Sequence, residues 1–149
     1  ASMRIISHRG NITGPNTNLE NSPAYVIEAA NSNYDVEIDV WLVGKEFYLG
    51  HDTPLYHVGE DFLLNTGFWC HAKNLKALHK LIDIGAHCFW HQNDQVTITS
   101  KGYIWCYPNT KEFNDKSIAL CFEKNATIPQ NCYGICTDYP NLLKEKINK

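Results

Sequence analysis

The sequence predicts an α/β domain that begins with parallel βα units and continues with more closely spaced strands. Short β-rich runs occur along the whole chain, and two helical segments fit between the early runs. The later runs lie too close together for full helices between them. The first half therefore predicts strands crossed over by helices, and the second half predicts shorter connections.

The expected strands are runs rich in β-branched and aromatic residues. They cover 4–7, 35–41, 46–50, 68–71, 87–91, 96–99, 103–107, 117–122 and 133–137. Only Ser100-Lys101-Gly102 separates 96–99 from 103–107, which is typical of a hairpin. If 46–50 is an inserted hairpin strand, eight strands remain for the main sheet.

Start and stop signals mark the expected helices. Ser22 and Pro23 open the first, which runs to about residue 32. The second covers 74–85 and ends at a glycine. Its expected buried stripe is Leu75, Leu78, Leu81 and Ile82. Residues 141–149 are a candidate third helix.

Length and composition predict one soluble domain over 1–149. Hydrophobic residues make up 44% of the chain and charged residues 19%, which is ordinary for a folded protein. A net charge of -3 and a pI of about 6.1 argue against nucleic-acid binding. We find no apolar run that would span a bilayer and no secretory signal, so stable membrane insertion is not expected.

Cysteine usage predicts a reducing, cytoplasmic location. Of the six cysteines, Cys70, Cys88, Cys106 and Cys121 lie in apolar or aromatic runs, where free thiols pack as small hydrophobic groups. A bridge between Cys132 and Cys136 stays open as an alternative.

The run 34–41, YDVEIDVW, carries apolar residues on one face and Asp35, Glu37 and Asp39 on the other. The simplest interpretation is an edge strand with one solvated face. However, several other runs also end in ionisable or polar residues, and strand ends converge in a βα barrel. These residues are His8-Arg9, His51-Asp52, His71 with Lys73, Asn93-Asp94 and Asp138. A convergent polar site is the competing interpretation.

The motifs SHRGN, LENS, YDVEIDVW and LGHD, in that order, resemble those of the glycerophosphodiester phosphodiesterases. The closing GICTDYPNLL is also similar, so the resemblance extends from Ser7 to about Leu143. Sphingomyelinase D and phosphatidylinositol-specific phospholipases are similar more distantly. The resemblance implies a compact or degenerate TIM (β/α)8 barrel with short or missing helices, because 149 residues is well below the roughly 250 typical of that fold.

The resemblance also implies roles for individual residues. His8 and His51 would be the catalytic acid and base, Glu37 and Asp39 the ligands of Mg²⁺ or Ca²⁺, and Arg9 and Lys73 the phosphate partners. Glu20 would be the acid of the helix-start motif, and Asp35 is expected to be structural.

The chain departs from the family pattern at His71, where a third carboxylate ligand is usual, and at Leu19, where proline is usual. We favour water-filled Mg²⁺ or Ca²⁺ coordination, with His71 nearby as a substrate-binding or outer partner. Two alternatives stay open. His71 could ligate through nitrogen and favour Mn²⁺ or Zn²⁺, or Asp94 could supply another oxygen.

The expected function is metal-dependent hydrolysis of glycerophosphodiesters or similar small alcohol phosphodiesters. The alternatives are a non-catalytic barrel that binds a phosphorylated ligand, and a lyase that releases a cyclic phosphate.

The remaining polar and aromatic residues have simpler expected roles. These are surface positions for His57 and His79, structural positions for His87 and His91, core packing for Trp69, Trp90 and Trp105, and a strand-end cap for Asp138.

Overall fold

The computed structural model describes residues 3–148 and places every strand in one curled ten-stranded sheet. The strands are β1 (Arg4–His8), β2 (Asp35–Val43), β3 (Glu46–Leu49), β4 (Tyr56–Val58), β5 (Phe68–Ala72), β6 (Cys88–Phe89), β7 (Val96–Ile98), β8 (Ile104–Cys106), β9 (Ser117–Leu120) and β10 (Gly134–Thr137). The helices are α1 (Pro23–Asn31), α2 (Glu60–Leu63), α3 (Leu75–Ile84) and α4 (Pro140–Ile147).

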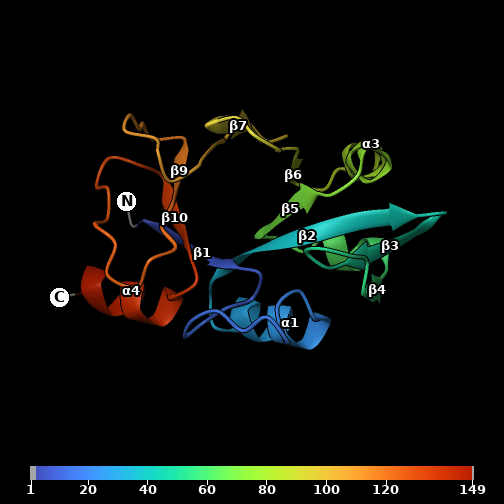
Figure 1. Ribbon diagram of the computed structural model, residues 1–149, viewed down its shortest axis with the longest axis horizontal. Helices are drawn as coiled ribbons and strands as arrows, with labels where there is room; N and C mark the ends of the chain where they lie inside the picture. The colour runs from blue at the N-terminus through green and yellow to red at the C-terminus, as the bar shows by residue number, and fades with distance from the viewer. Residues whose placement is uncertain (1–2, 149) are drawn as a thin grey trace.

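β1 lies at the centre of the sheet, parallel to β2 on one side and to β10 on the other. The parallel pairing continues from β2 to β5 and β6, and from β10 to β9 and β8. β3, β4 and β7 pair antiparallel with their neighbours. Figure 1 shows these strands as an open arc, with α1, α3 and α4 outside it. The molecule is therefore a curled mixed half-barrel.

The expectation of a TIM barrel is wrong. Helices and strands do not alternate after β6, and no helix lies between β6 and β10 within residues 3–148. The connections 107–116 and 121–133 carry no apolar stripe of helical period, so they run as loops. Phe113 and Ile128 from these loops, together with Leu143 of α4, pack on Ala119 and Ile135. Loop side chains thus cover a face that helices cover in a TIM barrel.

Most local predictions are confirmed. Every expected run contains a strand, although 87–91 shortens to Cys88–Phe89, and 96–98 forms a hairpin with 104–106. The run 46–50 is an antiparallel strand beside β2, and α4 is the candidate third helix. Neither β4 nor the one-turn helix α2 was expected.

The caps of α3 also agree with the sequence, but its buried stripe differs. Asn74 Oδ1 accepts a hydrogen bond from the Ala77 amide at 3.0 Å, and Gly85 ends the helix in the left-handed conformation with φ 81°. Leu81 is buried as expected. Leu75 and Ile82 are exposed instead, because the helix lies on the sheet through Ala77 and Leu81.

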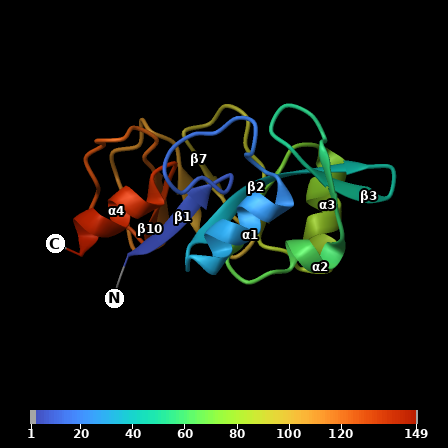
Figure 2. The same cartoon turned by 90° about the horizontal axis from the view of Figure 1, so that it is seen from below.

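The two faces of β2 are both buried. Val36, Ile38 and Val40 are fully buried in the core beneath α1 and α3, which lie along the outside of the sheet in Figure 2. Glu37 and Asp39 on the opposite face are only 3% and 1% exposed. The solvated-edge interpretation of this strand is therefore wrong, because its acidic face points into the half-barrel.

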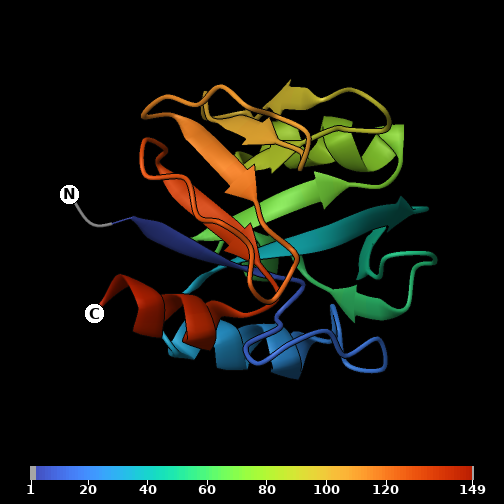
Figure 3. The same cartoon turned by 60° about the vertical axis from the view of Figure 1, so that its left-hand side comes forward.

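Apolar side chains from six strands pack on the inner face of the curled sheet. Figure 3 shows how the strands bend around this face. The packed residues are Ile6, Trp69, Phe89, Trp105, Ile118, Leu120 and Cys136. This confirms core packing for Trp69 and Trp105. All six cysteines are free thiols, so Cys132 and Cys136 do not form the alternative bridge. Within residues 3–148, no helix has the length and apolar character needed to cross a bilayer.

Candidate metal and phosphate site

The turn after β1 holds Arg9 in a strained backbone conformation beside β2. Arg9 has φ 60° and Gly10 has φ 92°, the left-handed region that side chains with a Cβ rarely occupy. A Cβ on Gly10 would lie 2.8 Å from the Tyr25 ring, so only glycine fits. The Arg9 amide donates to the Glu37 carbonyl at 2.9 Å. The motif His8-Arg9-Gly10 therefore fixes the guanidinium against β2.

The LENS motif supplies two anchors for this turn. Glu20 accepts hydrogen bonds from Arg9 Nη1 at 3.2 Å and from Asn11 Nδ2 at 3.1 Å. The Asn21 side chain pairs with Asp39, accepting from its amide and donating to Oδ2, both at 2.9 Å. Asn21 thereby sets the orientation of one carboxylate of β2.

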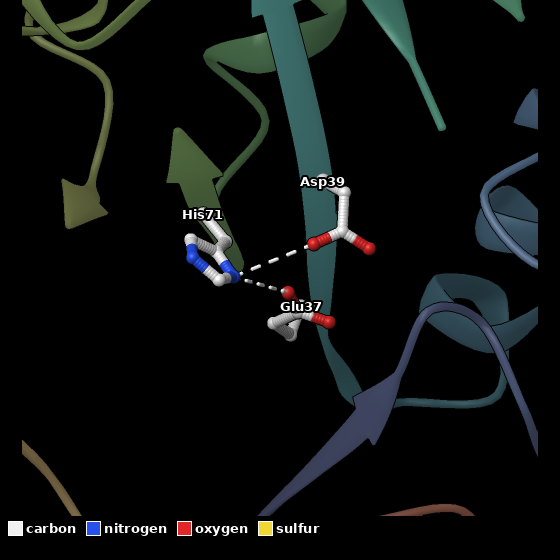
Figure 4. Close-up of side chains that lie close together, drawn as sticks. All are labelled: Glu37, Asp39 and His71. Carbon is white, nitrogen blue, oxygen red and sulfur yellow. Dashed lines mark ion pairs between the residues drawn. The ribbon is translucent and has the colours of Figure 1, made fainter. Parts of the chain in front are cut away.

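Glu37 and Asp39, the carboxylate pair, lie beside His71 of β5 (Figure 4). His71 Nδ1 is 3.4 Å from Asp39 Oδ1 and 3.9 Å from Glu37 Oε2. Arg9 Nε lies 3.3 Å from Asp39 Oδ2 but makes no hydrogen bond there. Glu37 Oε1 is also buried without a hydrogen-bond partner, with His8 Nε2 3.8 Å away. The carboxylate pair therefore has a buried oxygen, Glu37 Oε1, that accepts no hydrogen bond.

Burial and like charge oppose ionisation of Glu37. Burial raises the pKa of Glu37 well above its usual value, and the charge of Asp39 adds to the effect. Burial also acts on Asp39, but the nearby His71 ring, with Arg9 and the hydrogen bond from Asn21, lowers the pKa of Asp39. Four carboxyl groups, those of Glu20, Glu37, Asp39 and Asp138, thus lie around the two cations Arg9 and Lys73. A bound divalent cation would offset this excess of acidic groups and favour an anionic ligand.

His8 is oriented by an aspartate from the opposite end of the chain. Its Nδ1 donates to Asp138 Oδ1 at 2.8 Å, and Asn11 Nδ2 donates to the same oxygen at 2.9 Å. Nε2 of His8 therefore points to the carboxylate pair. Sequence reasoning marked Asp138 as a polar strand end but interpreted it as a cap. Its role depends on the pairing of β1 with β10.

His51 lies on the loop after β3. Gly50 begins this loop, and a Cβ there would lie 2.0 Å from the Thr53 carbonyl oxygen, so the tight turn requires glycine. The Trp41 indole donates to the Gly50 carbonyl at 2.7 Å and holds the turn on β2. His51 Nδ1 is 2.7 Å from Asp52 Oδ1, and its side chain is 44% exposed. This histidine is much more open to solvent than His8.

A cavity of about 770 Å³ joins these groups. It contains every site residue that the sequence predicts: His8, Arg9, Glu37, Asp39, His51, His71 and Lys73. The rest of the lining includes Trp105, Tyr107, Leu120 and Phe122, which we call the apolar wall, and the Phe122 ring packs on His8 with centroids 4.5 Å apart. Gln92 and Asn93 complete the lining. The cavity therefore combines charged residues on or just after β1, β2, β3 and β5 with apolar residues on or just after β8 and β9.

Other candidate residues lie elsewhere. Asp35 accepts from the Trp69 indole at 3.0 Å and pairs with Arg4 at 3.6 Å, which fits its expected structural role. Asp94 is exposed and lines a neighbouring hollow with His91. It does not join the carboxylate pair.

Sequence reasoning missed Asn11, Asn21 and the apolar wall. Asn11 is the last residue of SHRGN and Asn21 the third of LENS, so both lay within recognised motifs, and that membership was the available signal. The wall residues cluster at the ends of β8 and β9, in runs interpreted as core strands.

The donor chemistry of the site fits a divalent cation. Across residues 3–148, Glu37, Asp39 and His71 are the one group of three such side chains with donor atoms within 4.8 Å of one another. An unpartnered, buried Glu37 oxygen is the kind of atom that a cation would satisfy. No protein-family model, curated protein or solved structure matches this chain.

Proposed function

We propose that this protein is a metal-dependent phosphodiesterase that hydrolyses glycerophosphodiesters or similar small alcohol phosphodiesters. One observation carries the proposal: two histidines, two phosphate-binding cations and a buried carboxylate pair converge on one cavity. They come from the turns and ends of β1, β2, β3 and β5, which are separated along the chain. The resemblance to glycerophosphodiester phosphodiesterases in the motifs that supply these residues supports the same conclusion.

Phosphodiester cleavage needs the phosphate charge to be neutralised, a base at the nucleophile and an acid at the leaving oxygen. Glu37 and Asp39 would hold a divalent cation, which would supply electrostatic stabilisation of the phosphoryl oxygens. Arg9 and Lys73 line the same cavity and would bind the phosphate directly. His8 and His51 would divide the proton transfers. Asp138 keeps His8 oriented by accepting from Nδ1, which leaves Nε2 free to exchange a proton.

The test is a hydrolysis assay on glycerophosphocholine and on bis(p-nitrophenyl) phosphate. Each would be run with added Mg²⁺, Ca²⁺, Mn²⁺ or Zn²⁺ and with excess chelator. We expect turnover that requires a divalent cation and that Asp39→Asn abolishes. Glu28→Gln, an exposed position on α1, is the matched control and should leave turnover unchanged. Absence of turnover with every cation would refute the proposal.

A non-catalytic phosphoryl-binding protein is the second candidate. The exposure of His51, whose neighbour Asp52 is itself 89% exposed, favours it, because a catalytic histidine is usually held more firmly. Binding of glycerol 3-phosphate to the wild type, without turnover of either diester, would support this candidate. Phosphorus NMR of any product would separate hydrolysis from lyase chemistry, because a lyase releases a cyclic phosphate.

A further inference from the structure

His71 occupies the position where the sequence departs from the family pattern, and its surroundings indicate what the histidine does. We propose that His71 Nδ1 is the third protein ligand of the cation, so that the site selects Mn²⁺, Co²⁺ or Zn²⁺ over Mg²⁺ and Ca²⁺. This inference rests on the cation of the proposed function, but not on the reaction.

The tautomer of His71 is determined by its outer hydrogen bond. Nε2 lies 3.3 Å from the carbonyl oxygen of His91, and a carbonyl can only accept, so Nε2 carries the hydrogen. In the neutral imidazole, Nδ1 then presents a lone pair toward the carboxylate pair. A metal-bound histidine commonly donates its second ring N–H to a backbone carbonyl in this way.

The ring is also held in place by packing. It stacks on Phe89 with centroids 4.9 Å apart and an angle of 20° between planes, and the side chain is only 15% exposed. The carbonyl that His71 contacts belongs to His91, whose own ring stacks on Tyr107 with centroids 3.7 Å apart. Little reorientation is therefore available to Nδ1.

The distances suit a shared ion. Ligands bound to one ion at about 2.1 Å cannot be more than about 4.2 Å apart. Nδ1 lies 3.4 Å from Asp39 Oδ1 and 3.9 Å from Glu37 Oε2, both within that limit. Three lone-pair donors facing one another repel unless a proton or a cation lies between them.

The surroundings of the other two carboxylate oxygens, Asp39 Oδ2 and Glu37 Oε1, also fit a bound metal ion. Asp39 Oδ2 is held by Asn21 Nδ2 at 2.9 Å, which leaves Oδ1 directed to His71. Glu37 Oε1 is buried with no hydrogen-bond partner at all. An ion pair between protonated His71 and Asp39 would leave that oxygen unsatisfied, whereas a cation with bound water could satisfy it.

A nitrogen donor changes which metals bind best. Imidazole suits Zn²⁺ and other first-row transition ions, whereas Mg²⁺ and Ca²⁺ prefer oxygen ligands alone. The expectation of Mg²⁺ or Ca²⁺ followed from two carboxylates considered alone. With His71 included, the donor set of two oxygens and one nitrogen favours the transition ions.

The experiment measures metal binding directly on the protein after a chelator has removed any bound ions. Calorimetric titrations with MnCl₂, ZnCl₂, MgCl₂ and CaCl₂ give the affinities, and electron spin-echo envelope modulation of the Mn²⁺ complex detects a coordinated ¹⁴N. We expect Mn²⁺ to bind more tightly than Mg²⁺, with ¹⁴N coupling present. His71→Gln should lower Mn²⁺ affinity by about 100-fold or more and remove the coupling, because losing even an outer partner typically costs 10–100-fold.

His71→Glu supplies an oxygen in place of the nitrogen and should shift the preference toward Mg²⁺ and Ca²⁺. His79→Gln, at an exposed position on α3, is the control for losing a histidine and should keep wild-type binding. Circular dichroism of each variant verifies folding, and His71→Glu keeps the test meaningful if His71→Gln is poorly folded.

The outcomes separate this inference from the proposed function. Mn²⁺ binding without ¹⁴N coupling, or unchanged Mn²⁺ affinity in His71→Gln, would overturn the role of His71 even if metal-dependent hydrolysis is observed. Coupling without hydrolysis of any diester would support His71 as a ligand and count against the phosphodiesterase. Absence of binding by all four ions would overturn both.

Discussion

Replacing Glu37 with glutamine should stabilise the metal-free protein while removing its response to metal. Glu37 is 3% exposed, Oε1 has no hydrogen-bond partner, and a second carboxylate lies beside it on the same face. Glutamine keeps the shape of the side chain, removes the buried charge, and supplies an amide that can donate to Asp39. The carboxylate is therefore expected to oppose folding when no cation is bound.

The size of the effect can be bounded. Two unit charges no more than 4.8 Å apart repel by at least about 3.5 kcal/mol at an effective dielectric constant of about 20, and Arg9 offsets part of this. A carboxyl with an ordinary pKa of 4.5 can instead take up a proton, which costs about 3.4 kcal/mol at pH 7. The expected gain for Glu37→Gln is therefore about 1–3 kcal/mol, or about 2–10 °C in Tm for a domain of this size.

The assay is urea unfolding followed by tryptophan fluorescence, first with excess EDTA and then with MnCl₂. At a Mn²⁺ concentration one hundred times its Kd, the wild type should gain about 2.7 kcal/mol and the variant almost nothing. The difference in unfolding free energy between the variant and the wild type should then shrink or change sign. Glu28→Gln controls for an exposed carboxylate. If Glu37→Gln were less stable than wild type in EDTA, the carboxylate would be stabilising the fold and the reasoning would be refuted.

Three further predictions concern histidines and their partners. His8→Ala and His51→Ala should each lower kcat by about 100-fold or more, and the wild-type pH–rate profile should be bell-shaped; full rates in both variants would count against acid–base roles. Asp138→Asn should lower kcat by at least about 100-fold with little change in KM, because its amide no longer fixes the His8 tautomer; an unchanged kcat would make Asp138 purely structural. Burial lowers the pKa of His87 from its ordinary value of 6.5 to about 4. Between pH 6.5 and 4 this histidine is therefore protonated in the unfolded chain but neutral in the folded protein, so the free energy of unfolding should fall as the pH drops through that range. His87→Gln should flatten this part of the curve in urea titrations, and an unchanged slope would assign the loss to other groups.

The local features of the fold could be predicted because short segments determine them. The alternation in 35–41 identified a strand with two distinct faces, and Asn74 and Gly85 marked the ends of α3. Helical crossovers predicted the parallel direction of the early strands and the short gap predicted the β7–β8 hairpin, but the loops after β8 and β9 carried no comparable signal for the parallel pairing of β8, β9 and β10. The fold class was wrong because the family resemblance implied a closed barrel with short or missing helices, whereas the sheet is an open half-barrel in which β3, β4 and β7 run antiparallel to their neighbours.

The site residues could be predicted from motifs, but their partners could not. His8, Glu37 and Asp39 stand in recognisable local patterns. The contact of His8 with Asp138 joins residues 130 positions apart and exists only because β1 pairs with β10. The ligand role proposed for His71 likewise depends on β5 lying next to β2 in a register that sets His71 opposite Asp39.

The uneven distribution of helices has a consequence for how this scaffold could diversify. The charged side of the cavity stands on β1, β2 and β5, and helices pack on the outer side of these strands, with α1 and α3 on β2 and β5 and α4 on β1. The apolar wall combines Trp105 of β8 and Leu120 of β9 with Tyr107 and Phe122, which belong to the loops 107–116 and 121–133. Doubling the length of a flexible loop costs only about 0.6 kcal/mol, whereas a change in a close-packed helix–sheet layer typically costs several times more. Insertions in these loops should therefore be tolerated more readily than changes in the helix-covered layer, and they could reshape the apolar wall while the charged side keeps its geometry.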